Sequence, residues 1–114
     1  MSTITTHVLD TALGRPAVGV AIVLERVESG GSPVQIGAGI TDGDGRQRAL
    51  LPPGEGAENG DYRLRFATHS YFARDGRETF YPEVVVEFRV EGGSAHYHVP
   101  LLLSPYGYAT YRGS

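Results

Sequence analysis

Residues 96–114 read HYHVPLLLSPYGYATYRGS and contain two segments of β-strand character, separated by a tight Ser-Pro-Tyr-Gly turn. Side chains along a β-strand alternate between the two faces of a sheet, so every second residue belongs to the same face. One face carries Tyr97 and then an apolar residue at every second position as far as Leu103, and we expect this face to lie in the core. His96 and His98 then lie together on the outward face.

The end of this stretch, YRGS at 111–114, combines aromatic, guanidinium and hydroxyl groups. Chain termini usually fray and drift in composition. We therefore expect this end of the chain to be held in place and to take part in function.

The segment 4–9 also separates into two faces. We assign Ile4 and Val8 to the core. The opposite, outward face then carries Thr5, His7 and Leu9. Leu9 competes for the core, which leaves the reverse assignment open. On our assignment two strands each present histidine beside apolar residues, a pattern more typical of an interface or a site than of solvated surface.

The whole chain has the composition of a turn-rich β protein. It has 114 residues, with 16 glycines, seven prolines and 40% hydrophobic residues, and this length suits one domain, residues 1–114. Strand-like segments alternate with turn signals at the spacing of a β-sandwich. They cover residues 4–9, 18–27, 34–39, 46–50, 61–67, 83–90, 95–103 and 108–112. The sequence therefore predicts an all-β fold, with residues 68–74 as the one short helix.

The turns that connect these segments are rich in glycine. Asp42-Gly43-Asp44-Gly45 predicts a tight hairpin, because Asp-Gly pairs supply the positive φ that such turns need. Residues 91–94, Glu-Gly-Gly-Ser, predict a second hairpin connection.

Charge and residue usage exclude several classes of function. The net charge of −3 argues against nucleic acid as a partner, and the chain has no cysteine for disulfides, thiolate metal sites or cysteine nucleophiles. No apolar run approaches the roughly 20 residues that span a bilayer, so no membrane partner is expected. The first residues lack the pattern of a secretory signal. We expect a cytoplasmic location.

His96 and His98 lie about 6–7 Å apart on one strand face, which can suit a metal ion. A zinc site needs a third protein ligand, and only His7 and His69 remain as further histidines. Two exposed strand histidines without a ligand are the simpler structural alternative. A general acid or base role is attractive because free imidazole titrates near neutral pH.

Arg46 follows the Asp-Gly turn, at the start of a predicted strand. The preceding residues resemble the start of a calcium loop, but Arg46 and Pro53 fall where that loop needs oxygen ligands. From this position the guanidinium could be aimed at an anionic or carbonyl-rich ligand, although a solvated arginine at a strand end is the ordinary alternative.

Taken together, these motifs closely resemble those of 5-hydroxyisourate hydrolases, the transthyretin-like enzymes of uric acid breakdown. The resemblance runs from about residue 3 to residue 114. It is carried by THVLD at 6–10, GRPA at 14–17, DGR at 44–46, HYHVPL at 96–101, SPYGY at 104–108 and YRGS at 111–114. Transthyretin itself, a hormone carrier, lacks the last of these motifs. One departure is Ala109, where many members have serine.

The resemblance implies a transthyretin-like eight-stranded β-sandwich with one short helix, assembled as a homotetramer with sites where two dimers meet. It implies hydrolysis of 5-hydroxyisourate without metal or organic cofactor. The family's catalytic positions fall on His7, Arg46, His98 and Ser114, with His7, Arg46 and Tyr111 contacting substrate. Either histidine could activate the attacking water, and Arg46 would stabilise the developing oxyanion.

Two other classes of function stay open at this point. A transthyretin-like carrier could hold a small aromatic ligand in its channel, but such a channel has no need of titratable histidines beside an arginine. A purely structural β-sandwich fits poorly with the YRGS motif.

Overall fold

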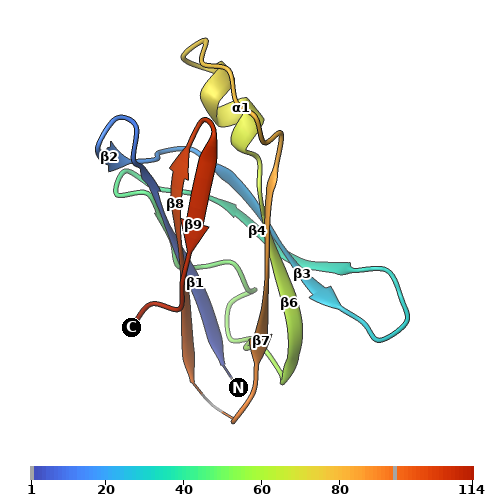
Figure 1. Ribbon diagram of the computed structural model, residues 1–114. Helices are drawn as coiled ribbons and strands as arrows, with labels where there is room; N and C mark the ends of the chain where they lie inside the picture. Colours follow the sequence, from blue (N-terminus) through green and yellow to red (C-terminus); the bar gives the residue numbers. More distant parts are fainter. Residues whose placement is uncertain (1, 94) are drawn as a thin grey trace.

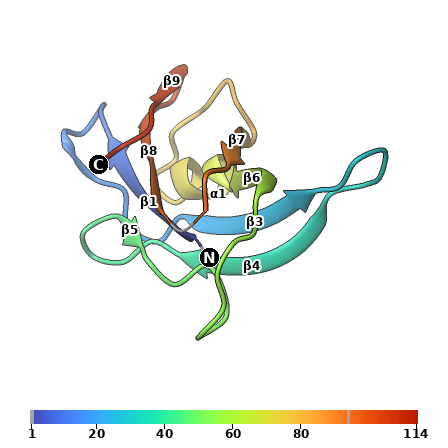
Figure 2. The same ribbon diagram turned by 90° about the horizontal axis from the view of Figure 1, so that it is seen from below.

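The computed structural model describes residues 2–93 and 95–114 and shows two β-sheets packed face to face, with one short helix at one end (Figures 1 and 2). One sheet has the strand order β2-β1-β8-β9, with β5 also paired to β1, and the other has the order β4-β3-β6-β7. The elements are β1 (Thr3–Asp10), β2 (Arg15–Pro16), β3 (Ala21–Val27), β4 (Val34–Ile40), β5 (Arg46–Gln47), β6 (Gly60–Phe66), α1 (Thr68–Ala73), β7 (Val84–Val90), β8 (His96–Ser104) and β9 (Gly107–Thr110).

The predicted β-sandwich with one short helix is confirmed, and each of the eight predicted strands overlaps an observed one. β2 was not predicted; its two residues pair with the end of β1. β3 begins at Ala21 rather than at residue 18, because Gly19 has φ +78° and interrupts extended backbone. The segment 46–50 forms a strand over only two residues.

Two predicted hairpins are wrong, because the strands on either side of each connection do not pair with each other. The turn at 42–45 joins β4 to β5, and these strands belong to different sheets. Residues 91–94 likewise link β7 to β8 across the sandwich, and residue 94 lies outside the described residues. Asp-Gly and Gly-Gly signals identify a change of chain direction, whereas the pairing of the flanking strands depends on which faces the core buries.

Side-chain alternation on β8 and β1 is confirmed by burial. Tyr97 and Leu103 on β8 are buried, as are Ile4 and Val8 on β1, whereas His96 is exposed. Burying each such aliphatic side chain contributes roughly 1.5–3 kcal/mol relative to exposure. Because most of the apolar residues of β1 and β8 face the opposite sheet, the outer face carries Thr5, His96 and His98 beside the partly exposed Leu102.

A buried ion pair joins the helix end of the sandwich to β1. Asp10 is fully buried and accepts hydrogen bonds from the Tyr71 hydroxyl (2.7 Å), the Arg77 guanidinium (2.9 Å) and the backbone N–H of Leu13 (3.0 Å). The Arg77 guanidinium also lies 4.8 Å from the centre of the Phe72 ring. Burial raises the pKa of Asp10, but these hydrogen bonds outweigh it and hold the pKa below its ordinary value.

Replacing Asp10 with asparagine is expected to lower the free energy of unfolding at pH 7 by about 3–5 kcal/mol, because it leaves Arg77 without its buried partner. The lowered pKa stabilises the fold above the unfolded value near 3.8 and loses this effect as the pH falls through the folded value. Urea unfolding should therefore show a difference that shrinks in acid. Asp75→Asn, which removes an exposed partner of Arg77, is the control. Equal losses of unfolding free energy in Asp10→Asn and Asp75→Asn would contradict the stabilising role of the Asp10–Arg77 pair.

Candidate active site

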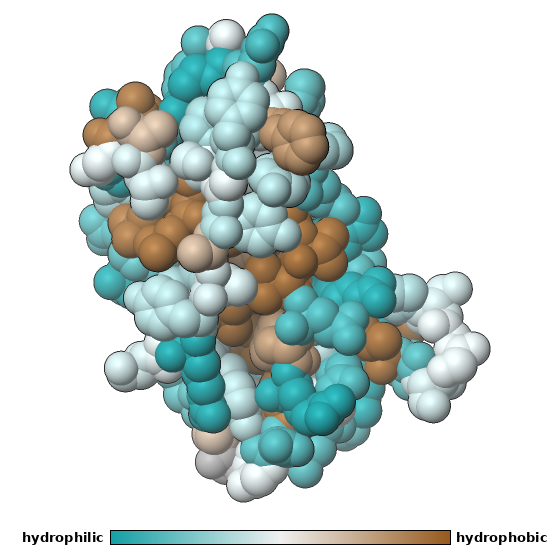
Figure 3. Space-filling view, in the orientation of Figure 1, coloured by the Kyte–Doolittle hydropathy of each residue, from teal (hydrophilic) through white to brown (hydrophobic). Residues whose placement is uncertain are grey.

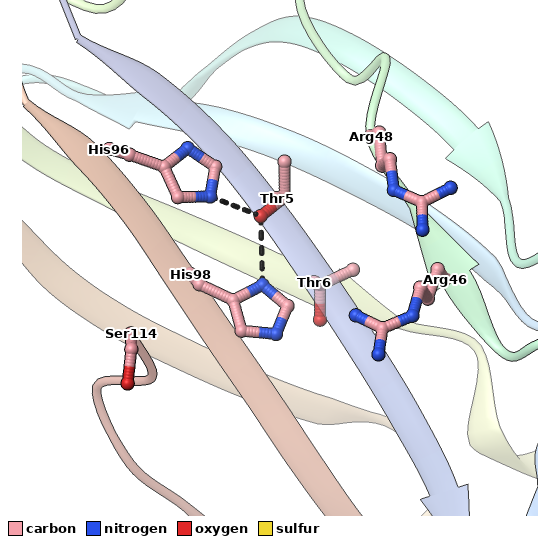
Figure 4. Close-up of a pocket in the computed structure, with 7 residues that line it drawn as sticks. All are labelled: Thr5, Thr6, Arg46, Arg48, His96, His98 and Ser114. Atoms are coloured by element: carbon pink, nitrogen blue, oxygen red, sulfur yellow. Dashed lines mark hydrogen bonds between the residues drawn. The ribbon is translucent and has the colours of Figure 1, made fainter.

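A cavity of about 160 Å³ lies on the outer face of the five-stranded sheet (Figure 4). It is lined by side chains from β1, β8, β5, the segment just after β5 and the end of the chain. They are Thr5, Thr6, Arg46, Arg48, His96, His98 and Ser114.

The parallel pairing of β1 with β8 places the first part of this site. Thr3 lies opposite His96, and Thr5 lies opposite His98. Because alternate residues of both strands share one face, the hydroxyls and imidazoles form two adjacent rows on the outer side of the sheet. The Thr5 hydroxyl oxygen is 2.8 Å from Nδ1 of His98.

The turn before β5 places Arg46. The Asp42 carboxylate accepts hydrogen bonds from the backbone N–H groups of Asp44 (2.9 Å) and Arg46 (3.0 Å), which fixes the turn. Gly45 has φ +76°, and a Cβ there would meet the carbonyl oxygen of Val8 at 2.5 Å, so the turn can approach β1 only with glycine. Arg46 then pairs with His7 of β1, and its side chain lines the cavity.

His7 is the residue of β1 opposite Arg46 in this antiparallel pairing. Its Nε2 is 2.8 Å from the carbonyl oxygen of Asp44. A carbonyl can only accept, so Nε2 donates, and the neutral ring keeps a lone pair on Nδ1. His7 is not among the residues that line the cavity, but it lies close enough to contribute to the electrostatics of His98.

His98 is half-buried among cationic neighbours. Burial lowers the pKa of His98 below its ordinary value, and Arg46, His96, His7 and Arg48 lower it further by repelling a positive charge. The ring is therefore neutral near pH 7. A neutral imidazole next to an arginine can accept a proton from water while the guanidinium stabilises negative charge on the substrate.

The C-terminal segment reaches the cavity through Gly113. Its backbone N–H donates to the carbonyl oxygen of His98 (2.7 Å), and the two residues form an isolated β-bridge. A Cβ on Gly113 would meet Cδ2 of His98 at 2.6 Å. The bare backbone thus packs on the imidazole and brings Ser114 into the lining.

Replacing Gly113 with alanine is expected to lower kcat about tenfold, because the new methyl group displaces the His98 ring and small misplacements of a reacting group are costly. Gly107→Ala is the matched control, since its Cβ would find the nearest atom, Oγ of Ser104, at 3.8 Å. Steady-state kinetics and thermal unfolding of both variants would check this. Equal activities in the two variants would show that Gly113 does not position the ring.

Tyr111 lies elsewhere in the single chain. It is 56% exposed and lines a second cavity of about 290 Å³, together with side chains of β7 and the core face of β8. The neighbouring Arg112 places its guanidinium 4.5 Å from the centre of the Tyr97 ring in the same region. The YRGS motif therefore divides between two places, with Ser114 at the first cavity and Tyr111 at the second.

Four side chains of the first cavity were not among the predicted site residues: Thr5, Thr6, Arg48 and His96. Alternation had placed Thr5 on the outward face, and this signal could have identified it. Its position beside His98 depends on the parallel pairing of β1 with β8, which no local pattern reveals.

No group of three or more His, Cys, Asp or Glu side chains within residues 2–93 and 95–114 is arranged to hold a metal ion. His96 and His98 stack with ring centres 6.3 Å apart, and their nitrogens bond to threonine hydroxyls. Over the same described part of the chain, no helix has the length and apolar character needed to cross a membrane.

The fold and the cavity define a small β-sandwich protein that carries an imidazole–guanidinium site on the outside of one sheet. Comparison with known proteins agrees with this class: residues 4–113 match the model of the HIUase/Transthyretin family. The chain belongs to this family.

Individual relatives are similar over nearly the whole chain. A 5-hydroxyisourate hydrolase of Salmonella typhimurium is 51% identical over 108 residues, which cover 95% of this chain and 78% of that protein. The structure of Klebsiella pneumoniae 5-hydroxyisourate hydrolase superposes with a TM-score of 0.84 at 35% identity, covering 100% of this chain and 94% of that one. Transthyretin from Sparus aurata superposes with a TM-score of 0.89 at 31% identity, over 97% and 96% of the two chains.

Proposed function

We propose that this protein is a 5-hydroxyisourate hydrolase of purine (urate) catabolism. It opens the six-membered ring at the N1–C6 amide-like bond and yields 2-oxo-4-hydroxy-4-carboxy-5-ureidoimidazoline. The observation that carries the proposal is the half-buried His98 imidazole beside Arg46 in one cavity, where burial and nearby charges lower the pKa of His98. The names of the relatives and the YRGS motif support it.

In the proposed mechanism the Nε2 atom of His98 deprotonates the attacking water. This nitrogen is the one available for the reaction, because Nδ1 is engaged with Thr5. Arg46 orients the substrate's oxygens and stabilises the oxyanion that forms as water adds to the ring carbonyl. His7 assists from the neighbouring position, and Ser114 contributes hydrogen bonds at the end of the cavity. No cofactor takes part in these steps.

We further propose a homotetramer with the sites at dimer–dimer contacts. The cavity is open on an outer sheet face. Within residues 2–93 and 95–114, β7 and β9 are terminal strands of their sheets, and the outer edge of such a strand can pair with another chain. Figure 3 shows apolar surface over the region between β9 and β7. In such an assembly Tyr111 would bind substrate across a subunit contact, since within one chain it lines the second cavity. The proposed location is the cytoplasm, which suits a chain without cysteine.

Ultraviolet absorbance of freshly generated 5-hydroxyisourate tests the activity directly. Purified protein should accelerate the decay in proportion to its concentration, and the acceleration by His98→Ala should be about 10²–10⁴-fold smaller. Decay at the spontaneous rate would overturn the proposal; retention of an aromatic ligand by the same preparation would then favour a carrier. Size measurements at falling protein concentration, with activity in parallel, test the assembly, because sites formed between copies lose activity on dissociation.

A further inference from the structure

Thr5 connects the cavity to the protein surface through a continuous row of hydrogen bonds. Its hydroxyl oxygen is 2.8 Å from Nδ1 of His98 and 3.1 Å from Nε2 of His96. On the far side of His96, Nδ1 is 2.6 Å from the hydroxyl of Thr3. Figure 4 shows Thr5 between the two rings, with one bond to each. Within a single chain His98 is half-buried, whereas His96 and Thr3 are exposed, so the row leads from the half-buried ring to groups in contact with solvent.

Donor and acceptor roles along this row are linked. A hydroxyl has one proton, and a neutral imidazole has one N–H and one lone pair. If Nδ1 of His98 donates to Thr5, then Thr5 donates to Nε2 of His96, and Nδ1 of His96 donates to Thr3. In this direction Nε2 of His98 keeps its lone pair, which is the form that a general base needs.

The surroundings of His98 disfavour the protonated, positively charged form of its ring. The charged and titratable groups that face it are His7 on β1, Arg46 on β5, Arg48 just after β5, and His96 on its own strand. A proton that stayed on His98 would add a positive charge to a half-buried ring in the same cavity as Arg46 and Arg48. His96 offers the same chemistry in contact with water.

We propose that Thr5 and His96 form a proton relay that carries the charge of His98 to the surface during hydrolysis. This inference rests on the proposed function and deepens it, since it concerns how the same site handles the proton taken from water.

The transfer balances atom by atom. Water loses a proton to Nε2 of His98, while the Nδ1 proton passes to the Thr5 oxygen and the Thr5 hydroxyl proton passes to Nε2 of His96. His96 becomes an imidazolium at the surface, and the hydroxide adds to the carbonyl. When the C–N bond breaks, the leaving ring nitrogen takes the proton from Nε2 of His98. The two relay steps then run backwards and restore the starting arrangement.

Variants at Thr5 separate the relay from packing. Thr5→Val keeps the shape of the side chain but removes the hydroxyl, and kcat should fall about tenfold with KM nearly unchanged. Thr5→Ser keeps the hydroxyl and should retain activity within about threefold. Thr11→Val, which removes a threonine hydroxyl bonded to a backbone carbonyl outside the cavity, is the matched control. Equal losses in Thr5→Ser and Thr5→Val, or full activity in both, would overturn the relay.

His96→Asn tests the outer end of the row. Asparagine can bond to Thr5 but cannot accept its proton, so kcat should fall about tenfold and recover as imidazole buffer is added at constant pH. His69→Asn, an exposed histidine on α1, should show neither effect. Activity of His96→Asn within twofold of the unchanged protein, or a loss that imidazole does not reverse, would overturn the role of His96.

Nitrogen NMR provides a readout independent of turnover. The resting protein should carry the His98 proton on Nδ1, and Thr5→Val should show a mixture of the two neutral forms. Failure of the relay is distinguishable from failure of the proposed function. In the first case the unchanged protein hydrolyses 5-hydroxyisourate and the Thr5 and His96 variants match it; in the second the unchanged protein itself is inactive.

Discussion

Replacing His98 with alanine lowers the expected kcat by about 10²–10⁴-fold, the range associated with a positioned general base. The loss should appear in kcat and in kcat/KM alike, because the proton is taken up only in the transition state. Folding should be little affected, since the side chain is half-buried on the outer face of its sheet and its Nε2 atom lies toward the cavity (Figure 4). Ultraviolet kinetics and thermal unfolding on the same preparation would measure both.

The pH dependence gives this prediction a second readout. Burial and the neighbouring cations lower the pKa of His98, so the neutral ring persists to lower pH than free imidazole, which titrates near 6.5. The rate should therefore stay high below pH 6.5 and decline only as the pH falls through the lowered value. His69→Ala, on α1, is the control and should keep the full profile. Turnover of His98→Ala close to that of the unchanged protein would exclude His98 as the base.

Replacing Arg46 with alanine should lower kcat about 10²–10³-fold, as expected when a preorganised oxyanion donor is removed. Arg46→Lys should recover part of this loss, because it keeps the charge but not the fork of N–H donors. Arg63→Ala, on the outer face of β6 in the other sheet, removes an equally large cation from a surface ion pair and should have little effect.

Arg46→Ala should also shift the pH profile in a defined direction. Arg46 lowers the pKa of His98, so its removal raises that pKa and moves the acid limb of the rate to higher pH. A large loss of activity with an unmoved limb would place Arg46 in substrate binding alone. Activity equal to that of Arg63→Ala would contradict its role at the site altogether.

The sequence predicted the sandwich, the helix and the faces of β1 and β8, because these depend on alternation and on glycine-rich turns that are visible locally. Tyr97 and Val8 illustrate this: each lies in the core face that period-two alternation assigned. The two hairpins were predicted wrongly because a turn sequence shows where the chain reverses but not which strands pair with each other. β2 was missed because two residues are too few to show a period.

For the site, the sequence motifs indicated His7, Arg46, His98 and Ser114, and the structure brings these residues to one face of one sheet; their roles stay predictions. Thr5 could not be connected with His98 beforehand, since their contact depends on strand pairing between distant segments. Tyr111 departs from the group because the chain crosses from the second cavity to the first within the YRGS motif.

The pairing of β1 with β8 also governs when activity can arise. Thr5 and His98 are 93 positions apart, and hydrogen bonds over such separations are formed late because a long loop must close first. During synthesis β1 is made first, and β8 is made only after β2 to β7. All strand pairs that do not involve β8 can therefore form before β1 pairs with β8. Until then, the edge of β1 that pairs with β8 in the folded protein is unpaired and can pair with another chain. The rate at which turnover recovers during refolding should therefore report the rate at which β8 pairs with β1.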